Sequence, residues 1–551
     1  MKKRIRKIFI YMKKSILLAV AFIATGALYA QKDSLNAVIQ VENDYNPVVT
    51  KAVKKGFTPT TEKSDNSTPL ELEFSQEATP FKGFTGERNI KELLPKQNGN
   101  YNGYARLGYG TGNNVDAKVS YQHAMGEKDK VSAVASLEGF NSNIDGPDGK
   151  WDSRFYSSWV GVGHTHKFSN AEWQSNIEFS NNVFNYNTTQ PGDKQNVQKF
   201  HIGTGLSSML AGPFAYEVGV RYSRNHYKHL PFLWNEAVQK KGRFGENNFG
   251  ADAVLKYELD GETWRNIALG INLDYYSYYK NIGYRNFAEL NLNPATNLKA
   301  GDWNIRLGAQ LNMITKGGTF LAVAPDISVE GAISKTVSLY ATIKGGRKAS
   351  NLETLEMLSP YWACSEQLKP AYTVADITSG VRISQKALSV NMYLGYAYTK
   401  DDLLTYAQPS LLQEGIGSCL AQENTIHVYA GARAGYDHKG WLKGSIAAKY
   451  NYWKCNEYSL LGTKPEFELE INGEARLLED IYMNVTYSFA TYAHDNPSLN
   501  KNELNLRTSY KFADRFGAFV EGNNLLNRNY VKYAGYYEQG INVLMGLSAS
   551  F

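Results

Sequence analysis

Two histidines separated by one residue have the spacing that comes closest to a metal site in this sequence. His164 and His166 flank Thr165, so on a strand both imidazoles would lie on one face, where they could share a metal ion. No carboxylate or cysteine accompanies them at ligand spacing. We therefore interpret them as polar side chains that face a water-filled interior, and we expect no bound metal or other cofactor. His226 and His229 stand near a predicted strand end, where interface or loop histidines are commoner than ligands.

The sequence has three cysteines, Cys364, Cys419 and Cys455. Their intervals of 55 and 36 residues match no metal-binding motif, and an odd number leaves at least one thiol unpaired. We expect all three in outward loops of an oxidising compartment, with at most one disulfide between them.

Other groups of residues could bind a ligand. The acidic residues of Ser142–Asp152 (Asp145, Asp148 and Asp152) lack the periodicity of a calcium loop, so we interpret that segment as a solvated turn. Aromatic pairs could stack on sugars, but the girdles of membrane barrels have the same composition. The pairs are Tyr361-Trp362, Tyr452-Trp453 and Tyr536-Tyr537. We find no hydrolase-type Ser/His/Asp set and no glycine-rich phosphate loop, and we predict that the protein is not an enzyme.

Strands are the elements that must position these residues. Apolar and polar residues alternate with period 2 through most of residues 99–551, for example in 115–122 and 216–222. We count 22 candidate strands, mostly of 11–16 residues, which is long for a globular protein and suits a tilted membrane strand. The pattern predicts an all-β fold, namely a transmembrane antiparallel β-barrel of about 22 strands.

The connections between the predicted strands alternate in length. Those on one side are mostly short: 127–130, 169–172, 211–213, 331–334, 437–440 and 513–515. Those on the other side are mostly long: 142–153, 186–197, 229–241, 347–370, 400–423, 454–463, 492–501 and 526–539. Short periplasmic turns and long extracellular loops are typical of outer-membrane barrels. Two outer turns, 111–114 and 316–318, are short, and we expect a long inner connection near 294–302.

The N-terminus has the pattern of a secretory signal peptide, residues 1–30. Residues 1–14 contain seven Lys or Arg and no acid, an apolar run follows, and cleavage fits after Ala27 or Ala30. The whole chain has a net charge of +6, so removal of these seven charges leaves −1 and gives no reason to expect nucleic acid as a partner. After the signal there is no apolar run of about 18 residues, so we expect no transmembrane helix.

The last strand has a pattern that suits closure of a barrel. From Ile541 to Phe551 the odd positions are apolar and the even positions mostly small or polar, so one face can lie against lipid. The strand resembles the barrel-assembly signal of outer-membrane proteins, with Gly546 five residues before the terminal aromatic. Leu544 and Ala549 depart from that signal, which usually has a polar residue and a large hydrophobe there. An ordinary edge strand at a C-terminus is the alternative.

The hairpin before that strand resembles the C-terminal hairpin of TonB-dependent receptors. Asn523–Tyr530 and Gly535–Gly540 have the family's Asn-Leu strand ending, basic residue, tyrosine, glycine and aromatics. The family's Pro-Gly-Arg entry to the last strand is replaced by Glu-Gln-Gly, followed by Ile541. The resemblance implies a 22-stranded barrel, which agrees with the strand count.

The resemblance also implies an N-terminal plug domain, but only 68 residues, 31–98, stand between the signal and the first predicted strand. Five prolines and many charged, Ser and Thr residues predict that this periplasmic or lumenal segment is largely irregular. Within it, Ala37–Val41 resembles the short box with which such receptors recruit their energy-transducing partner. Barrels of this width normally have a filled lumen. We expect the loops near 347–370 and 400–423, together with residues 31–98, to restrict it.

These patterns predict a protein of the bacterial outer membrane for passage or uptake of a solute, with polar side chains along the path and loops as gates. The alternative is a barrel that transports nothing and serves as a scaffold or accessory subunit of an outer-membrane complex. The expected partners are outer-membrane lipid, the barrel-assembly machinery during biogenesis and, for a scaffold above all, other envelope proteins.

Overall fold

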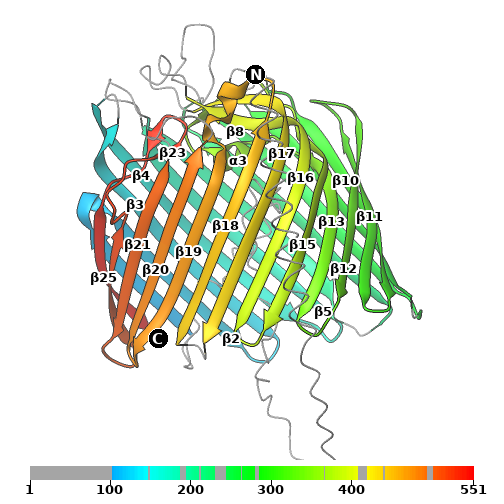
Figure 1. The fold of residues 1–551 in the computed structure, drawn as a ribbon, viewed down its shortest axis with the longest axis horizontal. Coiled ribbons are helices and arrows are strands. Elements are labelled where there is room, and N and C mark those ends of the chain that lie inside the picture. The colour runs from blue at the N-terminus through cyan, green and yellow to red at the C-terminus, as the bar shows by residue number, and fades with distance from the viewer. Residues whose placement is uncertain are drawn as a thin grey trace, which may run out of the picture. The chain divides into compact units, whose positions relative to one another are not determined.

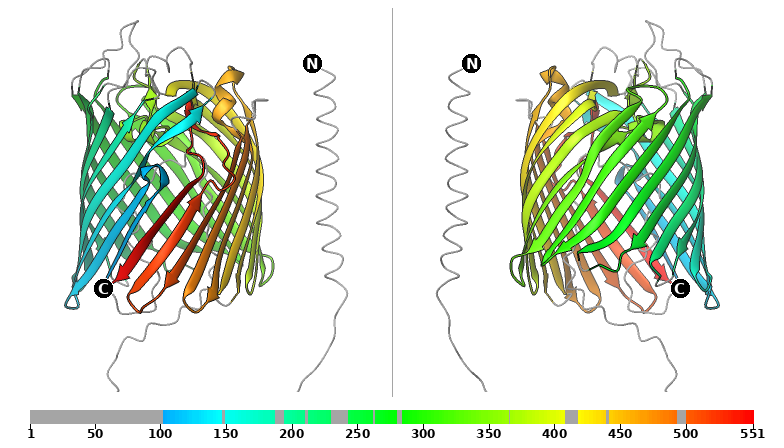
Figure 2. Two further views of the ribbon diagram at one scale, coloured as in Figure 1. Left: turned by 90° about the vertical axis from the view of Figure 1, so that its left-hand side faces the viewer. Right: turned by 90° about the vertical axis from the view of Figure 1, so that its right-hand side faces the viewer.

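The computed structural model describes residues 102–551, apart from 147–148, 187–193, 210–211, 230–242, 262, 280–283, 365, 408–417, 439–440 and 493–499. The predicted signal peptide, the segment 31–98 and its box lie outside the described residues. Over the described ranges the strands form one closed barrel with antiparallel neighbours (Figures 1 and 2). None of the described helices is long and apolar enough to cross a membrane.

The main sheet contains 22 barrel strands and one two-residue strand, β14 (Trp362–Ala363), which pairs with β17. The barrel strands are β1 (Gly103–Gly110), β2 (Val115–Met125), β3 (Asp129–Gly146), β4 (Gly149–Lys167), β5 (Ala171–Asn185), β6 (Lys194–Ser208), β7 (Phe214–Tyr227), β8 (Phe244–Glu258), β9 (Trp264–Tyr279), β10 (Phe287–Ala300), β11 (Trp303–Ile314), β12 (Leu321–Ala332), β13 (Val337–Lys348), β15 (Ala371–Gln385), β16 (Leu388–Tyr406), β17 (Ser418–His438), β18 (Leu442–Lys454), β19 (Pro465–Leu478), β20 (Ile481–Tyr492), β21 (Lys501–Lys511), β22 (Phe516–Asn523) and β25 (Asn542–Ser550). The other elements are η1 (Thr111–Asn113), α3 (Leu352–Leu358), η2 (Tyr458–Thr463), β23 (Val531–Tyr533) and β24 (Tyr536–Tyr537). The predicted barrel of about 22 strands is confirmed.

The first and last strands pair with each other and close the barrel. β1 pairs with β2 on one edge and with β25 on the other, where Gly108 lies opposite Gly546. The odd residues of β25 face outward, since Met545 and Leu547 are 62% and 63% exposed whereas Leu544 is buried. The apolar outward face predicted for the last strand is therefore confirmed.

Alternation along the strands places apolar side chains on the outer surface and polar side chains in the lumen. On β7 the outward residues include Phe214, Val220 and Tyr222. The strand register places these outward residues beside outward residues of β8 and β9. Val220 neighbours Ala251, which in turn neighbours Leu273. An apolar belt between two aromatic rows is the surface of a barrel that spans the outer membrane.

The long inner connection expected near 294–302 is wrong. β10 continues to Ala300 and β11 begins at Trp303, so this turn is short. Pro294 lies inside β10, opposite Ala309 by the register, and has no N–H to give to the ladder. The side-chain amide of Asn293 instead donates to the Ala309 carbonyl at 3.3 Å. This periplasmic turn is thus short, like the other predicted periplasmic turns.

Two predicted outer loops are partly strand. β3 continues to Gly146 and β4 begins at Gly149, so 142–153 is the end of a long hairpin rather than a solvated turn. β16 continues to Tyr406 and β17 begins at Ser418, within the predicted loop 400–423. These extensions raise the barrel wall around the extracellular mouth, where the cap described below lies.

Candidate functional site in the barrel mouth

Charged side chains on the lumenal wall are paired across adjacent strands or across one intervening strand. Arg221 on β7 bonds Asp252 on β8 at 2.9 Å and Asp274 on β9 at 2.7 Å. Arg306 on β11 bonds Asp326 on β12 at 2.8 Å. The same arrangement recurs in Arg106–Asp116, Arg382–Glu330 and Arg507–Glu521. The wall is therefore polar and offers hydrogen-bonding groups to a hydrated solute.

The extracellular mouth is occupied by the segment that follows β13. We call residues 349–364 the cap, and it contains α3 and β14. Asn351 precedes α3, and its side-chain oxygen accepts a hydrogen bond from the Thr354 N–H at 2.9 Å, as a helix N-cap does. Leu352 and Leu355 are fully buried. One face of this short helix thus packs inside the barrel.

Glu356 of α3 anchors the cap to three neighbouring strands of the wall. Its carboxylate accepts hydrogen bonds from the Asn182 amide on β5 at 2.8 Å and from the Tyr227 hydroxyl on β7 at 3.1 Å. It also pairs with Lys199 on β6 at 3.0 Å, and its side chain is only 7% exposed. A carboxylate this buried needs such partners. Glu246 on β8 adds a second anchor, because it accepts the first N–H of α3 at 3.0 Å.

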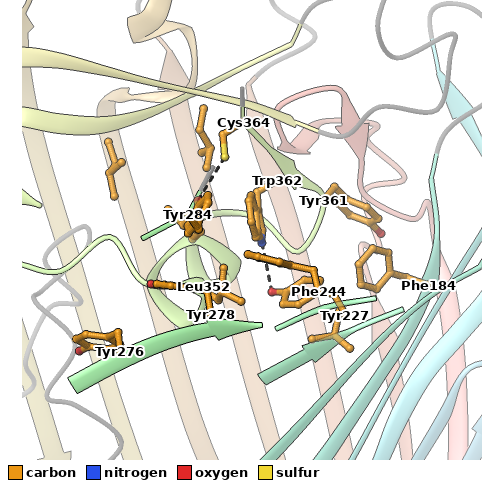
Figure 3. Close-up of a cluster of buried hydrophobic side chains, with 14 of the residues drawn as sticks. Phe184, Tyr227, Phe244, Tyr276, Tyr278, Tyr284, Leu352, Tyr361, Trp362 and Cys364 are labelled. Atoms are coloured by element: carbon orange, nitrogen blue, oxygen red, sulfur yellow. Dashed lines mark hydrogen bonds between the residues drawn. The ribbon is translucent and has the colours of Figure 1, made fainter. Parts of the chain in front are cut away.

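Aromatic side chains of the cap pack on aromatic side chains of the wall (Figure 3). Tyr361 stacks on Tyr536 of β24, with ring centroids 3.7 Å apart and planes at 5°. Trp362 is 1% exposed and donates its indole N–H to the Tyr227 hydroxyl at 3.3 Å. These side chains belong to one buried apolar cluster of the mouth. Its other members include Ile144, Trp151, Phe184, Val197, Phe244, Tyr276, Tyr278, Tyr284, Phe287, Ile314, Leu403 and Leu420. The mouth therefore has a buried, largely apolar core, and the loop near 347–370 enters the lumen as expected.

Two hydroxyl groups connect the cap to β17 and to the β23–β24 hairpin. The Ser359 and Ser418 hydroxyls lie 3.0 Å apart, and Ser418 donates to the Ala534 carbonyl at 2.7 Å. Both serines are fully buried. Beside them, Ala363 of β14 lies opposite Cys419 of β17. Any outward movement of the cap must break these bonds as well as the aromatic packing.

Burial changes the ionisation of two side chains of the cap. It raises the pKa of Glu353 to about 7, although Lys199 nearby acts in the opposite direction. Burial also raises the pKa of the Cys364 thiol to about 12, and that thiol lies 3.5 Å from the Tyr284 hydroxyl. A thiol that stays protonated at neutral pH is a poor nucleophile and a poor metal ligand. Cys364 therefore belongs to the packing of the cap.

The two spaced histidines lie on the outer surface, so their predicted lumenal position is wrong. His164 and His166 share the outward face of β4 with Val160, which is 50% exposed. Asp129 of β3 lies between them, 3.0 Å from Nε2 of His164 and 2.7 Å from Nδ1 of His166. Within the described ranges no group of three or more His, Cys, Asp or Glu side chains is arranged to hold a metal ion.

The three cysteines are free thiols in different surroundings. Cys364 in the cap is 2% exposed, and Cys419 is 1% exposed. Cys419 belongs to β17, so its predicted position in a loop is wrong. Cys455 follows β18 and is partly exposed.

Thiol labelling reports whether the cap is closed. We expect a membrane-impermeant maleimide to modify Cys455 roughly tenfold or more faster than Cys364 or Cys419, because modification needs an accessible thiolate. Peptide mass spectrometry after brief labelling of the folded barrel measures the three rates, and the unfolded chain provides the reference. Equal rates in the folded barrel would contradict a closed cap.

The three aromatic pairs singled out in the sequence lie in different surroundings. The pairs at 361–362 and 536–537 belong to the cap core or pack against it, so the girdle interpretation is wrong for them. Tyr452 is 55% exposed on the outer surface, as a girdle residue should be. Its neighbour Trp453 faces the lumen and stacks on His427 with centroids 3.6 Å apart.

The polar residues that anchor the cap to the wall were not identified from the sequence. The helix itself had a signal, because Asn351 is a good N-cap and Leu352, Leu355 and Leu358 have helical spacing. No sequence pattern indicated the wall residues that bind Glu356, because Tyr227 and Asn182 are 129 and 174 residues away from it in the chain. A search of the long loops for capped helical segments would have found α3 but not its anchors.

No protein-family model matches the chain, and no curated protein matches it in sequence. Solved structures match its fold. The copper transporter OprC matches with a TM-score of 0.62 and 12% identity, over 83% of this chain and 82% of that chain. The ferric enterobactin receptor PfeA of Pseudomonas aeruginosa matches with a TM-score of 0.61 and 11% identity, over 83% and 81% of the two chains. The siderophore receptor PirA of Acinetobacter baumannii matches with a TM-score of 0.62 and 11% identity, over 82% and 80%. The chain therefore has the barrel fold of TonB-dependent outer-membrane receptors, as the C-terminal hairpin predicted.

Proposed function

We propose that this barrel admits a solute across the outer membrane and that the cap is its gate. The observation behind this proposal is the arrangement of the mouth, where a small packed segment occupies the entrance to a lumen with a polar wall. The cap is held by side-chain contacts and by one short strand pairing, so it can move without unfolding the barrel. The copper and siderophore proteins of similar fold support a transport role.

A reversible covalent lock tests the gate. The Ser359 and Ser418 hydroxyls are 3.0 Å apart, so cysteines at both positions are close enough for a disulfide. We expect the double variant S359C/S418C, with the three native cysteines replaced by alanine, to lose passage when oxidised and to regain it with reductant. The probe is a hydrophilic antibiotic too large for general porins, scored by killing of cells that express the barrel. The single variant S359C is the control and should respond to neither condition.

The lock distinguishes the proposed gate from its alternative. If the oxidised double variant admits the antibiotic as well as the reduced one, cap movement is not part of the function. The scaffold hypothesis is favoured by the dry, extensively bonded core of the mouth, which resembles a folded domain more than a loose lid. In that case, affinity purification in mild detergent should recover other envelope proteins in stoichiometric amounts, and mass spectrometry would identify them.

A further inference from the structure

A basic cluster lies on the outer surface of β7, β8 and β9, just beyond the apolar belt. Arg224 and His226 are outward residues of β7, next in alternation after Tyr222. Arg243 immediately precedes β8, and Tyr279 ends β9. Arg224 and Arg243 are exposed. Over the described ranges neither has a carboxylate partner, which distinguishes them from the paired arginines of the lumen.

The position of Arg224 along the membrane normal can be estimated from the outward residues that precede it on β7. The outward residues Phe214 and Tyr222 mark the two ends of the apolar belt on β7. At about 3.3 Å per residue and a tilt of about 40°, their separation spans about 20 Å along the membrane normal, close to the height of such belts. Arg224 is two residues further, about 5 Å higher by the same geometry. It therefore lies at the level of the outer-leaflet headgroups.

Tyr222, in the upper aromatic row, points its hydroxyl group toward this level. Tyr222 lies against Phe249 with ring centroids 4.8 Å apart, and its hydroxyl donates to Asn247 at 3.0 Å. Asn247 is the register partner of Arg224. Girdle tyrosines direct the polar end of the ring toward the headgroups in this way. The boundary between apolar and polar membrane thus falls between Tyr222 and Arg224.

Tyr279 holds the cluster in one arrangement. The Arg224 guanidinium lies over the Tyr279 ring, 5.2 Å from its centroid. The Tyr279 hydroxyl is hydrogen-bonded to Nδ1 of His226, and the two rings are stacked 5.9 Å apart. The Tyr279 side chain also lies over Gly245, where a Cβ atom would collide with it. Arg243 stands two residues before Gly245, which the register pairs with both His226 and Tyr279, so Arg243 continues the same outward alternation.

We infer that Arg224, positioned by Tyr279 and His226, and the neighbouring Arg243 bind phosphate groups of the phosphorylated glycolipid of the outer leaflet. Guanidinium groups bind phosphate oxygens through paired hydrogen bonds, and exposed arginines just beyond the apolar belt match an anionic lipid rather than a soluble anion. The apolar belt directly below provides the contact surface for the acyl chains. The contact fixes this side of the barrel in the membrane and is independent of solute passage.

Native mass spectrometry of the purified full chain in detergent tests the site, with diphosphorylated lipid A as the probe. We expect the double variant R224Q/R243Q to bind it roughly thirtyfold more weakly, since each arginine beside an anionic lipid surface contributes about fivefold. The matched control is R265Q, because Arg265 is an exposed arginine at the periplasmic end of β9. This variant should bind like the unaltered protein. Heat-modifiable migration on gels confirms that all variants keep the barrel.

Two comparisons make the result specific. Dephosphorylated lipid A should bind the unaltered protein and the double variant equally weakly, and millimolar inorganic phosphate should not release the diphosphorylated lipid. Equal binding of diphosphorylated lipid A by R224Q/R243Q and the unaltered protein would overturn the inference. Release by inorganic phosphate would also overturn it, because the cluster would then bind a free anion rather than a lipid.

Discussion

Replacing Glu356 with alanine is expected to raise the open population of the mouth roughly a hundredfold. The substitution leaves the Lys199 ammonium without its carboxylate, and the Asn182 amide and the Tyr227 hydroxyl without their acceptor. Removal of one partner from a buried ion pair costs roughly 3 kcal/mol, which is about two factors of ten in an equilibrium. Lys199 is 19% exposed, so water recovers a part of this cost. Planar-bilayer recordings in potassium chloride measure the fraction of time spent open.

A second substitution separates loss of the pair from loss of packing. The double variant K199M/E356L removes both charges of the pair, and replacement of a buried pair by apolar residues of similar size is often neutral. The Asn182 amide and the Tyr227 hydroxyl lose their acceptor in this variant as they do in E356A. We therefore expect it to open far less than E356A. Met357 is 52% exposed on the same helix, so M357A should behave like the unaltered protein. If E356A shows the same traces as the unaltered protein and equally slow Cys364 labelling, Glu356 does not hold the cap.

The barrel was predictable from the sequence because its determinants are local. Period-2 alternation reports the two environments of each strand, and turn lengths report the two sides of the membrane. The errors came from residues whose types occur both in turns and in strands. The long connection expected near 294–302 begins at Pro294, yet the strand continues through this proline and the neighbouring Asn293 donates a hydrogen bond to the Ala309 carbonyl. Charged residues in 142–153 predicted a turn, yet they belong to a hairpin that extends beyond the membrane.

The candidate site was not predictable to the same extent, because its contacts join distant parts of the chain. Tyr361 stacks on Tyr536, and nothing near either residue in sequence indicates the other. The face of His164 depended on the register of β4, since a shift of one residue moves every side chain to the opposite surface. Sequence reasoning therefore selected aromatic residues of the mouth but assigned most of them to the membrane interface.

Replacing Gly546 with valine is expected to lower the yield of folded barrel at least about tenfold. A Cβ atom at Gly546 would collide with the Leu107 carbonyl and approach Cα of Gly108 to 2.7 Å, both in the backbone of β1. It would also meet Cζ of Phe519 at 2.6 Å. Backbone atoms cannot rotate away as a side chain can, so the cost exceeds the roughly 1–3 kcal/mol of ordinary overpacking. Because β1 and β25 form the pair that closes the barrel, the collision would destabilise the pairing of these two strands.

A substitution of the C-terminal residue, Phe551, separates closure of the barrel from recognition of its last strand in cells. Phe551 is 49% exposed on the outer surface, so F551A should change the stability of the finished barrel little. We expect F551A to refold in detergent like the unaltered protein but to reach the membrane poorly in cells, because we propose that the barrel-assembly machinery recognises the last strand there. G546V should fail in both settings. A Cβ atom added at Gly473 would meet no other atom within 4 Å, so G473V is a matched control that should succeed in both. Normal refolding of G546V would show that the pairing of β1 with β25 tolerates a side chain at this position.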